Sequence, residues 1–169
     1  ILKSINYNDA IEEFSKIIVK INKKIFGKIT ALIGVRKGSK RVINKNIRKI
    51  NNNENLLVNK IKILKKVDNI DKILVTSDCD VMLNIAKKEG VIVHKRPDYY
   101  ASDECPNSDN FAYIASICDT DNIIYTPVTS PFITESIYID MIKTYKNINI
   151  CLKYDSVVTS EELKEFIYS

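Results

Sequence analysis

The residues best suited to chemistry in this sequence are the basic and hydroxyl side chains of one short segment. Positions 36–49 contain seven of the 26 Lys and Arg residues of the chain and none of its 21 Asp and Glu residues. The segment begins Arg36-Lys37-Gly38-Ser39-Lys40-Arg41 and includes Lys45-Asn46. A glycine lets the backbone approach a ligand, so that amides, a hydroxyl and several cations face the same space. This pattern predicts either a site for a compact anion such as a polyphosphate or a basic loop that is simply solvated.

Two common phosphate-binding patterns are absent from this segment. It has neither the two glycines and Gly-Lys-Ser/Thr ending of a P-loop nor the G-x-G-x-x-G of a dinucleotide-binding turn. A nucleic-acid binder usually spreads its positive charge along a face and adds aromatic side chains for base stacking. The basic segment contains no aromatic residue. We therefore expect a nucleotide ligand and no nucleic-acid partner.

Metal-thiolate chemistry has little support in the composition. The four cysteines are Cys79, Cys105, Cys118 and Cys151, with no C-x-x-C pair, and His94 is the single histidine of the chain. We therefore predict no zinc site and expect reduced thiols. The chain has no apolar run of about 20 residues, and its first residues lack the apolar region of a signal peptide. We expect a cytoplasmic protein without membrane association.

Strand-like and helix-like patterns alternate along the chain. Short apolar runs predict buried strands at 29–35, 73–75, 91–93, 123–125 and 156–159. Helical spacing predicts helices at 9–25 and 56–67, and three more around residues 82–86, 111–118 and 138–145. The apolar stripe of the 111–118 helix is Phe111, Ile114, Ala115 and Cys118, and a long loop is expected at about 95–107. This alternation predicts an α/β fold with a mostly parallel sheet and helices on both faces. Ligands of such sheets lie at the carboxyl ends of the strands, where the basic segment is placed.

Local signals refine this fold. Ser77 and Asp80 are spaced for a reciprocal helix cap, so we interpret the Asp78-x-Asp80 pair as a helix start rather than a metal site. Gly27 and Gly90 are expected to end helices. We divide the chain into an N-terminal helical extension, residues 1–28, and a core, residues 29–169.

Five motifs in order resemble the acylneuraminate cytidylyltransferases, which are the CMP-sialic acid synthetases and their bacterial relatives. The match covers about residues 29–160. The motifs are Arg36-x-Gly38-Ser39-Lys40 with Lys45-Asn46, Val75-Thr76-Ser77-Asp78, Arg96-Pro97 with Ala101-Ser102-Asp103, Thr129-Ser130-Pro131, and Asp155-Ser156-Val157-Val158. The resemblance implies the Rossmann-like fold of the nucleotide-diphospho-sugar transferases.

The resemblance also implies an activity. In this family the anomeric hydroxyl of an acidic nonulosonic sugar attacks the α-phosphate of CTP, and pyrophosphate leaves with the help of Mg²⁺. Arg36 and Lys45 would stabilise the departing pyrophosphate as catalytic groups. Arg96 and Ser108 would read the cytosine. The residues implied to hold the triphosphate are Arg36, Ser39, Lys40, Lys45 and Asn46.

The sequence departs from the family at two points. Pro127 stands where the family often has a sugar-contacting Gln. The metal-binding aspartates and the dimer-forming arm of the family lie beyond the region matched here. We therefore leave the metal ligands unassigned, expect a homodimer only for a complete protein, and expect this chain alone to have little activity.

Two other functions stay open. One is the related cytidylyltransferase for the eight-carbon acid Kdo, whose first loop typically ends in Lys-Pro. The pair Lys45-Asn46 favours the sialic-acid side. The other is a nucleotide-binding domain without catalytic activity.

Overall fold

The structure is a computed structural model that describes residues 11–16, 26–38, 42, 44–51, 54–150 and 156–160. Four parallel strands form one sheet in the order β5-β4-β1-β6, and β2 pairs with β3 in a small antiparallel hairpin. The strands are β1 (Ile29–Gly34), β2 (Lys49–Asn51), β3 (Glu54–Asn55), β4 (Lys72–Ser77), β5 (Ile92–Lys95) and β6 (Asn122–Tyr125). The helices are α2 (Leu56–Leu64), α3 (Asp80–Lys88), α4 (Asp98–Ala101), α5 (Asn107–Ser116) and α6 (Glu135–Ile150).

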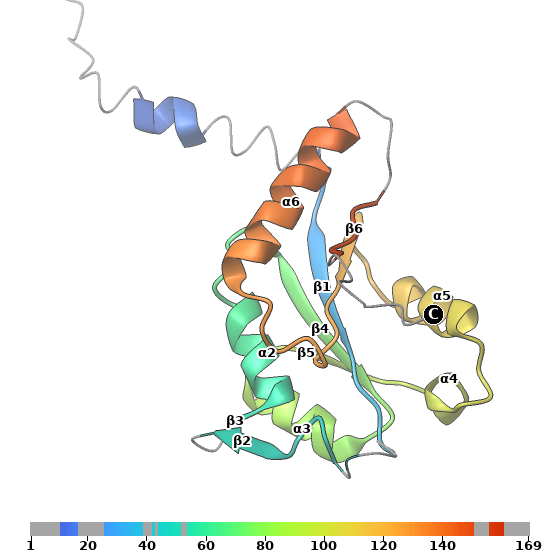
Figure 1. Cartoon of the computed structure of the whole chain (residues 1–169). Helices are drawn as coiled ribbons and strands as arrows, with labels where there is room; N and C mark the ends of the chain where they lie inside the picture. The colour runs from blue at the N-terminus through green and yellow to red at the C-terminus, as the bar shows by residue number, and fades with distance from the viewer. Residues whose placement is uncertain are drawn as a thin grey trace, which may run out of the picture.

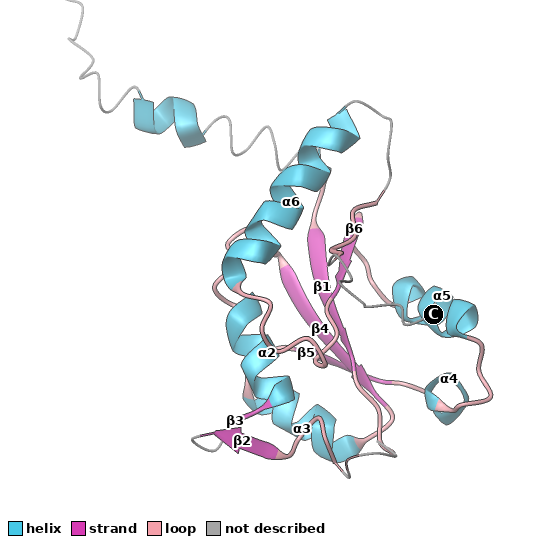
Figure 2. Ribbon diagram, viewed as in Figure 1, coloured by secondary structure: helices cyan, strands magenta, loops and turns pink. Residues whose placement is uncertain are grey.

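Helices cover both faces of the parallel sheet (Figure 1). On one face, α2, α3 and α6 bury the larger core, which includes Ile33, Val75 and Tyr138. On the other face, Ile114 of α5 packs against Leu32 and Leu74. Figure 2 shows the strands running between these two helical layers. The predicted α/β fold with a mostly parallel sheet is confirmed.

Strand β1 is central because both of its faces are apolar. From Ile29 to Ile33 every residue is buried, including Thr30. The strand pairs with β4 on one side and β6 on the other, so its carboxyl end is enclosed by two neighbours. Pairing with β4 continues past the end of β1, since the Val35 amide donates to the Thr76 carbonyl at 3.0 Å. The basic segment therefore starts from a rigid point.

The inward face of α5 differs from the predicted one. Ile114 is buried as expected, but Phe111 is 46% exposed and Ala115 is also exposed. Cys118 packs against this cluster as expected, and Tyr113 and Ile117 take the places predicted for Phe111 and Ala115. Phe111 lies edge-on to the ring of Tyr125 in β6, with centroids 5.0 Å apart. The helix is therefore rotated relative to the predicted apolar stripe, because Phe111 has an aromatic partner on the strand.

Three further expectations are corrected. Cys79, without a side-chain cap, precedes α3, while the Ser77 hydroxyl accepts from the Cys79 amide and Asp80 pairs with Lys95. The predicted strand at 156–159 is wrong, because residues 156–160 have no regular structure. Residues 156–159 line a largely apolar cavity of about 530 Å³ beside β6 and α6. The short helix α4 lies inside the region predicted to be a loop.

The N-terminal prediction is tested only in part. Residues 11–16 are helical, with Ile11 and Phe14 exposed, and the rest of the predicted helix lies outside the described residues. Phe26 is buried, and Gly27 has a φ of +67°, which suits the helix end predicted there. The division at residue 28 stays a prediction.

Candidate nucleotide site

The carboxyl ends of β1, β4, β5 and β6 lie at the same edge of the sheet, and the loops that follow them are tied together. The Lys37 amide, after β1, donates to Asp78 after β4 at 2.9 Å. The Arg96 amide, after β5, donates to the Ser77 carbonyl of β4 at 2.9 Å. After β6, the Thr126 amide donates to the Leu32 carbonyl of β1 at 2.9 Å. Parallel pairing thus brings the four loops that carry the charged and hydroxyl residues of the motifs to one edge of the sheet.

Arg36 reaches from the first loop to the segment after α4. Its guanidinium donates to the Ala101 carbonyl at 3.0 Å and pairs with Asp103 at 2.7 Å. The Arg36 side chain is 44% exposed, so it still faces solvent. These contacts join the first motif to Ala101-Ser102-Asp103, which the sequence suggested only by resemblance.

Asn46 braces the basic segment from within. It is buried, and its side-chain amide donates to the Arg36 carbonyl at 3.4 Å. Its own carbonyl accepts from the Leu57 amide at the start of α2 at 3.1 Å. Lys45 is half-buried beside it. Asn46 therefore fixes the loop that carries Arg36, whereas Ser39 and Lys40 lie outside the described residues.

Arg96 is a buried cation at this edge, with 4% of its surface exposed. Its Nη2 donates to the Val35 carbonyl at 2.6 Å, and its Nη1 donates to Asn110 at 3.2 Å. Burial lowers the pKa of the Arg96 guanidinium, and the nearby Asp78 opposes this shift. An arginine nevertheless stays protonated in proteins. Its Nε has no hydrogen-bond partner among the described residues, which leaves one buried donor for a ligand.

A glycine leaves space beside this arginine. A Cβ placed on Gly34 would lie 4.0 Å from Arg96 Nη1 and 3.5 Å from the Tyr125 hydroxyl. Gly34 is the last residue of β1, and Tyr125 is the last residue of β6. Sequence reasoning did not identify Gly34, Tyr125 or Asn110 as parts of the site. The one signal for Tyr125 was its alternation with Ile124, which packs on the opposite face.

Ser108 lies nearby on α5 but has no contact with Arg96. Its hydroxyl is exposed and donates to Asp109 at 3.0 Å. Asn110, two residues later, supplies the contact with the guanidinium. The structure therefore places Arg96 and α5 together, with Asn110 rather than Ser108 at the junction.

A model of the cytidylyltransferase family matches residues 30–165. This chain belongs to the cytidylyltransferase family. No curated protein matches the sequence. The matched region contains every residue assigned to the site, from Gly34 to Pro131.

Several solved structures share the fold of this chain. CMP:2-keto-3-deoxy-manno-octonic acid synthetase complexed with CTP has a TM-score of 0.62 and 15% identity, over 71% of this chain and 48% of that one. A cytidylyltransferase from Leptospira borgpetersenii has a TM-score of 0.53 and 21% identity, over 70% and 48%. The 4-diphosphocytidyl-2C-methyl-D-erythritol synthase from Anaerococcus prevotii has a TM-score of 0.52 and 16% identity, over 69% and 50%. The cytidylyltransferase chain described here thus spans about half the length of these structures.

Carboxylates at the strand ends of this cytidylyltransferase are already engaged. Asp78 accepts from the Lys37 amide, Asp80 pairs with Lys95 at 2.7 Å, and Asp103 pairs with Arg36. Within the described ranges, no three His, Cys, Asp or Glu residues converge as metal ligands do. The metal ligands therefore stay unassigned.

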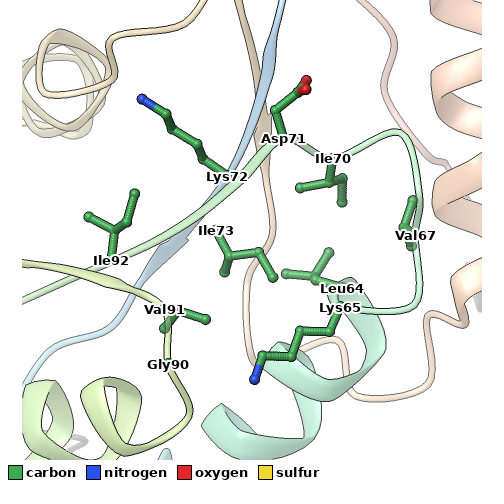
Figure 3. Close-up of a pocket in the computed structure, with 10 residues that line it drawn as sticks. All are labelled: Leu64, Lys65, Val67, Ile70, Asp71, Lys72, Ile73, Gly90, Val91 and Ile92. Atoms are coloured by element: carbon green, nitrogen blue, oxygen red, sulfur yellow. The ribbon is translucent and has the colours of Figure 1, made fainter.

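A second cavity, of about 330 Å³, lies at the opposite edge of the sheet (Figure 3). Its walls are mostly apolar, and it is bounded by the amino ends of β4 and β5. Lys72 points outward to Asp119 at 2.7 Å, and Lys65 donates to the Glu89 carbonyl. Ligand sites need a few convergent polar groups, and these two lysines are turned to other partners. We place no function of the cytidylyltransferase there.

The structure also bears on two predictions from composition. The cysteines that it describes, Cys79, Cys105 and Cys118, are all free. Among the described helices, none has the length and apolar character needed to cross a bilayer.

Proposed function

We propose that this chain carries the CTP-binding part of a cytidylyltransferase that activates a sialic-acid-like nonulosonic acid. One observation carries the proposal, namely that two arginines converge on the end of β1. Arg36 extends from the end of β1 toward Asp103. Arg96 donates a hydrogen bond to the carbonyl of Val35, the residue immediately before Arg36. One cation is exposed and the other is buried, which suits a charged triphosphate on one side and a base on the other.

The proposed reaction needs positioning and charge stabilisation more than a protein nucleophile. The sugar hydroxyl forms a new bond to the α-phosphorus of CTP, and the bond from that phosphorus to the pyrophosphate oxygen breaks. Arg36 and Lys45 meet the negative charge that builds on the leaving group. Mg²⁺ is the proposed cofactor and would add charge neutralisation, with phosphate oxygens as part of its ligand set. A cytoplasmic location and a homodimeric complete protein stay expectations from the sequence.

The nucleotide specificity provides the first test. At 100 times its dissociation constant, CTP should stabilise the fold by about 2.7 kcal/mol, because it binds only the native state. For a chain of this size that corresponds to a rise in the melting temperature of about 5–10 °C. GTP at the same concentration should give a much smaller rise, measured by differential scanning fluorimetry. Equal shifts with both nucleotides would contradict base recognition, and no shift with either would remove the proposal.

The acceptor is tested by pyrophosphate release with CTP and Mg²⁺. We expect almost no pyrophosphate from this chain, because Asp78, Asp80 and Asp103 are already engaged by other groups and the reaction is proposed to need Mg²⁺. The assay should compare N-acetylneuraminic acid with Kdo, since the CTP-complexed structure similar to this chain is a synthetase for that eight-carbon acid. Robust release with either sugar would contradict the expected inactivity, and the preferred sugar would identify the acceptor class. CTP binding without release would fit a domain without catalytic activity on its own.

A further inference from the structure

Helix α2 has a lysine on the face that it turns to the core. Leu57, Ile61 and Leu64 point inward, and Lys60 lies on the same stripe with none of its surface exposed. An isolated buried ammonium costs several kcal/mol of hydration, so lysine is rarely found fully buried. The position therefore calls for a specific role.

The ammonium of Lys60 is held by the turn after β6 and by α6. Its Nζ donates to the Ser130 carbonyl at 2.8 Å and to the Tyr138 hydroxyl at 2.8 Å. The same Nζ lies 5.2 Å from the centre of the Tyr138 ring. Beside it, Asn59 donates to the Pro131 carbonyl at 3.5 Å. Asn59 and Lys60 of α2 thus donate hydrogen bonds to two successive backbone carbonyls of the turn, those of Pro131 and Ser130.

Nothing in the described part of the chain neutralises this charge, because no carboxylate there lies within salt-bridge distance of Lys60. Burial lowers the pKa of Lys60, and it raises the pKa of Tyr138 to about 12. A buried polar group without a charged partner is costly, and an apolar residue of similar size would pack here at lower cost. Stability alone does not explain the lysine, whereas a fixed turn conformation does.

The turn held by Lys60 belongs to the proposed site. Thr126 anchors its start to the Leu32 carbonyl of β1, and Val128 is buried beneath it. Thr129 is exposed at its tip. The turn therefore leaves the sheet from the strand beside β1, which leads into Arg36. It has a buried side that contacts Lys60 and an open side that faces solvent.

We propose that Lys60 is a positioning residue that holds the Thr129-Ser130-Pro131 turn in the conformation that receives the acceptor acid sugar. The proposal rests on the proposed function, since it assigns the open side of this turn to the acceptor. Lys60 acts through the Ser130 carbonyl and does not touch the substrate. Loss of its ammonium frees that carbonyl and lets the turn relax, while the Arg36 and Arg96 contacts stay in place.

The contact itself is tested by carbon NMR of one carbonyl. Ser130-Pro131 is the only Ser-Pro pair in the sequence, so labelling serine with ¹³C′ and proline with ¹⁵N selects the Ser130 carbonyl alone. In Lys60→Met its resonance should move upfield, because it loses a charge-assisted hydrogen bond. In the parent protein the same resonance should titrate with a midpoint below 10.5, the ordinary lysine value, since burial disfavours the ammonium. This titration needs no variant, so a Lys60→Met protein that fails to fold does not prevent the test.

The functional consequence is tested by comparing two affinities. With a non-hydrolysable CTP analogue present, Lys60→Met should raise the dissociation constants of N-acetylneuraminic acid and Kdo by about 10- to 100-fold, the usual cost of a misplaced binding group. The dissociation constant of CTP should stay within about twofold of that of the parent. Tyr138→Phe, which keeps the bond to Ser130, and Lys62→Met, on the exposed face of α2, should leave all these affinities near parental values.

Each outcome has a clear consequence. An unchanged Ser130 resonance in Lys60→Met, or parallel losses of CTP and sugar affinity, would overturn the positioning role, because a merely structural lysine gives no such split. If neither acid sugar binds the parent protein, the assignment of the turn to the acceptor is wrong. Absence of CTP binding by the parent would instead reject the proposed function, and the melting-temperature assay detects that failure separately.

Discussion

Replacing Arg36 with alanine is expected to weaken CTP binding by about 10- to 150-fold. A charge-assisted hydrogen bond to a phosphate contributes about 1.5–3 kcal/mol, and that range corresponds to this loss of affinity. Stability without nucleotide should change by less than about 1 kcal/mol, because the bond from Arg36 to Asp103 is largely exposed to solvent. Isothermal titration with CTP and thermal unfolding without ligand measure the two effects.

Three further variants make this result specific. Arg36→Lys should restore only part of the affinity, because an ammonium lacks the planar fork of a guanidinium. Lys88→Ala removes the same charge at the exposed end of α3, so it should leave CTP binding near the parental value. Asp103→Asn should bind CTP somewhat more tightly, since Arg36 no longer has to leave a carboxylate. Parental affinity in Arg36→Ala would refute the assigned role.

The strands and the position of the site could be predicted because they follow from local pattern. Strand β1 is buried on both faces, so its residues form a nearly continuous apolar run that few other structures explain. Arg36 and Arg96 each follow such a run, and parallel strands bring their carboxyl ends together. The alternation of strands and helices therefore predicted the placement of both arginines at one edge.

Features that depend on contacts with residues distant in the sequence could not be predicted from local sequence pattern. The inward face of α5 was misassigned because Phe111 packs on Tyr125, a residue of β6. The apolar segment at 156–159 has strand-like composition, yet a strand needs a hydrogen-bonding neighbour, and the described residues there have none assigned. Lys60 resembles any lysine of a solvated helix until Ser130 and Tyr138 are placed beside it.

In the site, too, residue types follow from local pattern, whereas side-chain contacts depend on the tertiary structure. The motif predicts that Asn46 holds phosphate, and that role stays a prediction. The structure adds a contact that the motif did not reveal, from the side-chain amide of Asn46 to the Arg36 carbonyl. Base reading by Ser108 also stays a prediction, and the structure shows that Asn110 of the same helix accepts a hydrogen bond from Arg96. Which side chain of a helix meets a distant arginine depends on helix rotation, and residue types and spacing leave that rotation open by one or two positions.

Replacing Arg96 with methionine should have the largest effect on stability, because it removes a buried group that two acceptors share. The Val35 carbonyl and the Asn110 side chain would lose their donor. Each unsatisfied buried acceptor costs about 1–3 kcal/mol, and removal of a desolvated cation offsets part of that. We expect the free energy of unfolding to fall by about 2–4 kcal/mol, measured by urea denaturation. Asn110→Ala should cost less, because the bond from Arg96 to Val35 persists.

The same substitution should abolish discrimination between CTP and UTP. Cytosine presents two adjacent acceptors, O2 and N3, whereas the N3 of uracil carries a proton, and a guanidinium offers only donors. Nη1 of Arg96 lies beside the space left by Gly34, and Nε of the same guanidinium is a buried donor without a hydrogen-bond partner among the described residues. A base that supplies an acceptor to this guanidinium is therefore favoured over one that presents a proton. The parent should therefore prefer CTP clearly, and folded Arg96→Met should bind both nucleotides within about threefold of each other. Ser108→Ala should keep the preference of the parent, because the exposed Ser108 hydroxyl contacts Asp109 and not the guanidinium. If Arg96→Met keeps the discrimination and Ser108→Ala loses it, Ser108 in the first turn of α5, and not the buried arginine, recognises the base.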